Sequence, residues 1–172
     1  RSNHERAWWQ NLLAQPASFY GMVMAHLGVA FFIIGVTGVR GFESEQDLRM
    51  SVGSTAQLGG YDFELRALNP LQGPNYQAMQ GQFIVKQNGQ AIAMMAPEKR
   101  LYDSSQMPMT EAAISVGLTR DLYISLGEQL NERDWSVRIH IKPFVDWIWG
   151  GCFVMALGGL LAITDRRYRK RP

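Results

Sequence analysis

The chain has 172 residues, of which 47% are hydrophobic, and its formal net charge is +2. The two tails carry about +1 and +4, residues 40–143 carry −2 (ten Lys or Arg against twelve Asp or Glu), and Asp146 adds one negative charge. Because the positive charge lies in tails beside apolar segments, it does not indicate nucleic-acid binding, and a single cysteine, Cys152, excludes a disulfide within the chain.

The first predicted element is a transmembrane helix over residues 17–39, which follows an N-terminal tail of residues 1–16. Phe19 to Val39 is a run of 21 residues without Asp, Glu, Lys or Arg. As a helix it spans about 32 Å, enough for a hydrocarbon core of roughly 30 Å. A signal peptide would have a shorter apolar region with a small-residue cleavage site close behind it, whereas Arg40 to Glu43 follow here.

His26 lies near the middle of this run. An imidazole at bilayer depth costs free energy unless it has a partner, so it is a functional candidate. Neutral imidazole is the commonest metal ligand among side chains and also binds haem iron, but a hydrogen bond to another helix remains an alternative. Small residues at helical spacing nearby would admit either a flat macrocycle or a packed helix: Gly21, Ala25, Gly28 and Gly35.

Residues 40–143 are predicted to form a small antiparallel β sandwich or barrel. Alternation places Tyr61, Phe63 and Leu65 on one face of a strand. The segments 82–87 and 90–95 form a hairpin signal, because the intervening Asn88-Gly89 favours a type I′ turn.

The second half of this segment has the same character. Residues 121–126 and 135–142 are predicted strands, and in the latter Val137, Ile139 and Ile141 share one face while Arg138, His140 and Lys142 share the other. A short helix is predicted over residues 110–116.

A second transmembrane helix is predicted over residues 144–164, before a basic tail of residues 165–172. Its Gly- and Ala-rich composition suits close packing against another helix. Positive residues next to the ends of a span stay cytoplasmic, so both tails are expected in the cytoplasm and residues 40–143 on the outer side of the membrane. Tryptophans near the ends of the two spans are expected in the interfacial aromatic belts: Trp8, Trp9, Trp147 and Trp149. The predicted fold class is therefore membrane α plus all-β: two transmembrane helices flanking a small antiparallel sandwich or barrel-like domain.

No other residues suggest a catalytic or metal site. His140 falls on the polar face of a strand and His4 in a charged tail, so both are predicted to be solvated. Glu98, Glu111 and Asp121 have basic neighbours, which indicates structural ion pairs. The sequence has no Cys-x-x-Cys, zinc spacing, phosphate loop or GxSxG motif.

A family resemblance rests on five short sequence motifs that occur in this order along the chain: GPNY (73–76), PEKRLY (97–102), MTEAAI (109–114), LTRDLYISLGE (118–128) and KPFVDWIWGG (142–151). Together with the helix around His26 and the basic tail, they resemble the C-terminal region of the CcmF family of cytochrome c-type biogenesis proteins, to which the NrfE proteins are closely similar. We therefore expect this chain to be the C-terminal portion of a longer polytopic protein.

The resemblance implies a haem lyase component in the bacterial inner membrane, with residues 40–143 in the periplasm. Such proteins receive haem from the haem chaperone CcmE and, with the thioreductive, apocytochrome-binding subunit CcmH, help attach it to apocytochrome c. It implies that His26 is an axial ligand of the iron of a haem b held between two transmembrane histidines. The family's tryptophan-rich substrate-haem segment has no counterpart here, so no catalytic residue is expected.

Residues 40–143 are expected either to dock these partners or to cap the haem site. Two other functions fit the same outline. A transporter or channel subunit could use His26 as a proton relay, and an assembly scaffold could have the same architecture without a cofactor.

Overall fold

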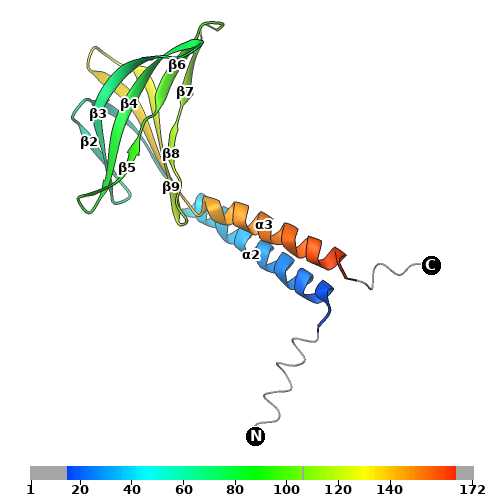
Figure 1. Ribbon diagram of the computed structural model, residues 1–172. Coiled ribbons are helices and arrows are strands. Elements are labelled where there is room, and N and C mark those ends of the chain that lie inside the picture. The colour runs from blue at the N-terminus through cyan, green and yellow to red at the C-terminus, as the bar shows by residue number, and fades with distance from the viewer. Residues whose placement is uncertain (1–14, 106, 166–172) are drawn as a thin grey trace. The chain divides into compact units, whose positions relative to one another are not determined.

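The computed structural model describes residues 15–105 and 107–165, and the chain divides into two compact units (Figure 1). One unit holds the two long helices, α2 (Ala17–Phe42) up to Thr37 and α3 (Val145–Ile163). The other is the all-β unit, Gly38–Phe144. The predicted fold class is confirmed, because two apolar helices flank an antiparallel β structure. The tails that contain His4, Trp8, Trp9 and the basic run after Asp165 lie outside the described residues.

Both helices are long and apolar enough to cross a membrane. α2 has 26 residues and a mean hydropathy of 2.1, and α3 has 19 residues and a mean hydropathy of 1.6. At 1.5 Å per residue these lengths are about 39 and 28 Å. α2 starts directly after Pro16 and continues three residues beyond Val39, where the apolar run ends, with Arg40 in its last turn.

Glycines bring α2 and α3 into backbone contact. A Cβ at Gly158 would lie 2.6 Å from Ala25 N and 2.6 Å from Gly21 O, and one at Gly28 would lie 2.7 Å from Gly151 O. The glycines on each helix are seven residues apart, so they recur on one face, and a side chain larger than hydrogen would hold the backbones apart. The small residues around His26 therefore form the α2–α3 contact, as the packing interpretation predicts.

The all-β unit contains two antiparallel sheets (Figure 1). The four-stranded sheet has the order β1 (Ser44–Ser51), β10 (Asp134–Pro143), β9 (Arg120–Gln129), β8 (Ala113–Ser115). The six-stranded sheet runs β2 (Thr55–Leu58), β3 (Tyr61–Gln72), β4 (Tyr76–Gln87), β6 (Glu98–Tyr102), β7 (Pro108–Glu111), with β5 (Gln90–Met95) also paired to β4.

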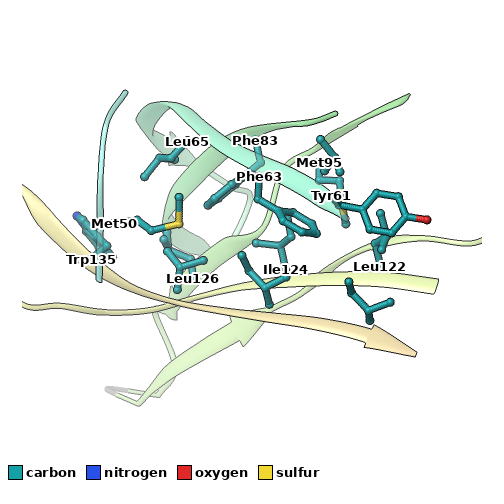
Figure 2. Close-up of a cluster of buried hydrophobic side chains, with 14 residues drawn as sticks. Met50, Tyr61, Phe63, Leu65, Phe83, Met95, Leu122, Ile124, Leu126 and Trp135 are labelled. Carbon is teal, nitrogen blue, oxygen red and sulfur yellow. The ribbon is translucent and has the colours of Figure 1, made fainter. Parts of the chain in front are cut away.

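The inner faces of the two sheets enclose one hydrophobic core. Figure 2 shows Phe63, Leu65 and Phe83 of the six-stranded sheet opposite Leu122 and the following core residues of β9. The alternation predicted for β3 and β10 is confirmed, since the apolar positions of both strands are buried and the alternate positions are more exposed. Burial of this apolar surface is the main force that holds the sheets together.

The hairpin between β4 and β5 is confirmed. Asn88 and Gly89 have φ angles of 51° and 78°, which is the combination that a type I′ turn requires. This turn sets the register in which Gln87 pairs with Gln90.

The predicted short helix over residues 110–116 is wrong. The segment forms the end of β7 and then β8 instead, and these pair with β6 and β9 respectively. Seven residues are too few to offset the cost of helix nucleation, whereas β6 and β9 each offer part of this segment backbone partners along one edge. Tertiary pairing therefore decides its structure.

Candidate functional site

His26 lies on the side of α2 that α3 does not cover. Its side chain is exposed, whereas Gly21 and Gly28 on the opposite side of α2 are buried against α3. Between Ala17 and Val39 it is the only residue of the Asp, Glu, His, Lys and Arg types. The imidazole is thus presented outward from an apolar helix pair.

A local hydrogen bond defines the tautomer of the neutral ring. His26 Nδ1 is 2.8 Å from the carbonyl oxygen of Met22, one turn earlier in the helix. A carbonyl can only accept, so Nδ1 carries the proton and the neutral ring keeps its lone pair on Nε2. Among residues 15–105 and 107–165, none donates a hydrogen bond to Nε2. Metal-binding histidines commonly have this arrangement, in which one ring nitrogen donates to a carbonyl and the other binds the metal.

The surface around the imidazole is apolar and slightly hollowed. Met22, Val23, His26 and Leu27 line an open hollow of about 320 Å³. A second hollow of about 820 Å³ lies towards the start of α2, lined by residues that include Met22, Phe19 and Ala162. Shared Met22 places the two side by side, so an apolar strip extends from His26 towards the N-terminal end of the helix.

These residues fit one face of a haem site. They provide one imidazole with a fixed tautomer and an apolar surface on which a porphyrin could lie. The described residues include no cluster of three or more His, Cys, Asp or Glu that could hold a metal ion.

Asp165 is a polar contact in the helical unit that the sequence analysis did not identify. Its side chain, which is only 7% exposed, accepts a hydrogen bond from Ser18 N at 3.2 Å, across 147 residues of sequence. A carboxylate at a helix N-terminus satisfies an unpaired N–H group and interacts favourably with the helix dipole. The contact fastens the first turn of α2 to the end of α3. An isolated Asp after an apolar run provided no signal for it.

The outer face of β1 and β10 carries a network of charges. Arg138 donates to both carboxylate oxygens of Asp47, at 2.7 and 2.9 Å, and contacts Glu45 at 3.2 Å. The hydrogen bond from Arg138 holds the pKa of Asp47 below its ordinary value. His140 Nε2 lies 2.7 Å from Glu45 Oε1, but without the alignment of a hydrogen bond. As predicted, His140 lies on the polar face of its strand, but the prediction that it is solvated is wrong, because its side chain is only 24% exposed and its Nε2 is buried.

The other carboxylates singled out in the sequence are mostly paired. Glu98 accepts hydrogen bonds from Arg100 and Gln80, both at 2.8 Å, and the Arg100 bond lowers the Glu98 pKa. Glu111 meets the same guanidinium at 3.5 Å. Asp121 is the exception.

Asp121, 3% exposed, accepts a hydrogen bond from Gly117 N at 3.0 Å. Arg120, its expected partner, donates to Tyr61 Oη at 2.9 Å instead.

Comparison with known proteins identifies relatives for nearly the whole chain. A family model described as "CcmF C-terminal beta-sandwich" matches residues 41–143. The cytochrome c-type biogenesis protein CcmF of Haemophilus influenzae is 46% identical over 169 residues, which are 98% of this chain and 26% of that protein. The NrfE protein of the same organism is 36% identical over 162 residues, 94% of this chain and 26% of that protein.

A solved structure described as cytochrome c heme lyase CcmF has the same fold. It superposes with a TM-score of 0.68 over 84% of this chain and 24% of that one, at 16% identity. At this identity the similarity concerns the fold alone. The chain spans about a quarter of the length of the curated relatives that it matches.

Proposed function

This chain belongs to the CcmF family, and from that premise we propose that it is part of a membrane haem lyase component in cytochrome c biogenesis. The CcmF relative is more similar to it than the NrfE relative of the same organism, which favours general cytochrome c maturation. The proposed location is the bacterial inner membrane. α2 and α3 cross it, residues 1–16 and 165–172 are cytoplasmic, and residues 40–143 are periplasmic, as the basic tails favour.

His26 is the proposed axial ligand of a haem b. The observation that carries this proposal is the 2.8 Å contact between His26 Nδ1 and the Met22 carbonyl, because it leaves Nε2 unprotonated on the outer side of the helix. Haem b, when bound, would supply a one-electron redox centre whose potential depends on its axial ligands and burial.

The chain's own residues would hold and orient this group. The Met22 carbonyl would restrain rotation of the imidazole and raise its basicity as a ligand. Met22, Val23 and Leu27 would exclude water from one face of the porphyrin. Any other group that holds the haem would come from outside the described residues.

The proposed role of the all-β unit is to dock partners at the periplasmic surface. Its core is continuous and its polar side chains are largely paired, as expected of a rigid binding module. The proposed partners are apocytochrome c, the haem chaperone CcmE and the apocytochrome-binding subunit CcmH. If the unit only caps the haem site, deleting residues 47–138 should leave capture of these partners unchanged.

The haem assignment is tested with His26→Ala and His26→Gly in the intact membrane protein. We expect both variants to insert normally and to lose the reduced b-type absorption and cytochrome c maturation. Added imidazole should restore part of the absorption in His26→Gly, because it can occupy the place of the side chain. Rescue distinguishes a ligand from a histidine that only stabilises the helix.

Ile34→Ala is the matched control, because Ile34 is another exposed side chain of α2 (49%) and does not line the hollow around His26. It should retain the absorption band. An unchanged b-type spectrum in His26→Ala would refute the ligand assignment, and a wild-type protein without any Soret band would favour the transporter or scaffold alternatives.

A further inference from the structure

The turn between β8 and β9 presents large apolar side chains to the outside of the all-β unit. Leu118 is 80% exposed and Val116 is 67% exposed. Turns normally place Gly, Pro, Asn, Asp or Ser at such positions, because these residues suit the backbone and solvent. A leucine at the tip of a turn therefore calls for an apolar environment that the unit itself does not supply.

Three hydrogen bonds hold the turn in shape. Arg120 N donates to Gly117 O at 3.2 Å, which closes the turn around Leu118 and Thr119. Gly117 N donates to the buried Asp121 carboxylate at 3.0 Å. The leucine is therefore displayed by a preorganised backbone, and binding at its tip would not require ordering the loop.

The third hydrogen bond relates the turn to the start of α3. Phe144 N donates to Thr119 O at 3.1 Å, and Phe144 directly precedes Val145, the first residue of that helix. Pro143 also pairs with Arg120 across β10 and β9. Thr119, the next residue after Leu118, is thus hydrogen-bonded to Phe144, the residue just before the proposed span.

The charges around the turn match a lipid surface. Arg120 and Lys142 flank it, and both are associated with tyrosines: Arg120 donates to Tyr61 Oη, and Lys142 Nζ lies 5.2 Å from the centre of the Tyr123 ring. Basic and aromatic side chains around an apolar tip are typical of the membrane interface, where anionic headgroups attract the cations.

We propose that the Val116–Thr119 turn inserts Leu118 and Val116 into the outer interfacial layer of the bilayer that α3 spans. The insertion would give the all-β unit an anchor in the lipid besides its covalent connections to the helices. This inference rests on the proposed span of α3. Its ligand is the lipid bilayer, and a protein segment covering the same leucine is the alternative that the experiment must exclude.

The test uses single-cysteine forms of the intact protein in vesicles of phosphatidylcholine and phosphatidylglycerol. The fluorophore NBD is attached to Leu118→Cys in a Cys152→Ser background, with any other cysteine replaced by serine. Leu130→Cys is the matched control, because Leu130 is also exposed (48%) but lies in the turn between β9 and β10, at the other end of β9. NBD attached to the natural Cys152, which lies in α3, reports whether α3 lies in the lipid.

We expect doxyl-labelled lipids to remove most of the emission at Leu118→Cys and at Cys152 and little at Leu130→Cys. Quenching at Cys152 without quenching at Leu118→Cys would overturn this inference while leaving the span intact. Loss of quenching at both sites would overturn the span and the inference together. A blue-shifted but unquenched label at Leu118→Cys would mean that protein, rather than lipid, covers the turn, which also overturns the inference.

Discussion

Gly158→Ala should separate the two long helices. A Cβ on Gly158 would lie 2.6 Å from both Ala25 N and Gly21 O, and these are backbone atoms that cannot rotate away. Ordinary contacts of a Cβ begin near 3.4 Å, so α2 and α3 must part locally by about 0.8 Å. The separation would weaken contacts along the whole interface, since close packing is what associates helices in lipid.

The neighbouring glycine supplies a matched control. Gly159→Ala places its Cβ in open space, with nothing within 4 Å. Both substitutions gain the same intrinsic helix propensity, about 1 kcal/mol. The difference between the two variants therefore isolates the overpacking cost, which we expect to be about 1–3 kcal/mol against Gly158→Ala.

The free energy of helix separation can be measured by titrating the purified protein in mixed micelles with sodium dodecyl sulfate. Tryptophan fluorescence reports the transition, because Trp147 meets the Phe31 ring edge-on with 5.6 Å between ring centroids. Gly158→Ala should denature at a lower detergent fraction than Gly159→Ala. Equal midpoints for the two variants would refute the argument that backbone contact at Gly158 controls the helix pair.

Two further predictions concern polar contacts. Arg100→Gln removes the hydrogen bond that holds the pKa of Glu98 below its ordinary value of 4.5. A carboxyl group with a lowered pKa stabilises the folded state at pH values above its unfolded pKa, and this stabilisation is lost as the pH falls through its folded pKa. The difference in unfolding free energy between wild type and Arg100→Gln, measured by urea titration, should therefore become smaller at acid pH. A difference that stays constant with pH would contradict this prediction. Asp165→Ala removes the acceptor for Ser18 N and should cost about 0.5–2 kcal/mol, whereas Asp165→Asn should lose only the charge–dipole part, about 0.3–1 kcal/mol. Hydrogen exchange in the first turn of α2 measures both, and unchanged protection in Asp165→Ala would rule out the cap.

The β strands were predictable where one face is buried and the other solvated. Phe63 and Leu65 in β3, and Val137 and Ile139 in β10, alternate with polar residues and are fully buried. This pattern is visible in the sequence because side chains on a strand have a period of two. The segment 110–116 lacks a clear period, so the prediction there relied on weak helix propensity, which pairing with β6 and β9 overrode.

The candidate site was predictable only in part. The position of His26 within an apolar run identified it, and the spacing of Gly21 and Gly28 indicated close helix packing. The sequence left open whether the imidazole lies on the side of α2 that packs against α3 or on the opposite side. The structure places His26 on the side of α2 opposite the glycines, where its imidazole is exposed.

The sequence by itself determined the two apolar helices, the alternating strands, the Asn88-Gly89 turn and the place of His26 within the first apolar helix, because hydropathy, alternation and turn chemistry are local properties of the chain. Only the tertiary structure decided which residues meet across long separations. It joins Ser18 to Asp165 and Thr119 to Phe144, and it seats Gly158 on the backbone of Ala25. These contacts depend on how complete elements pack together, and a local pattern cannot encode the partner of a group that lies far away in the sequence.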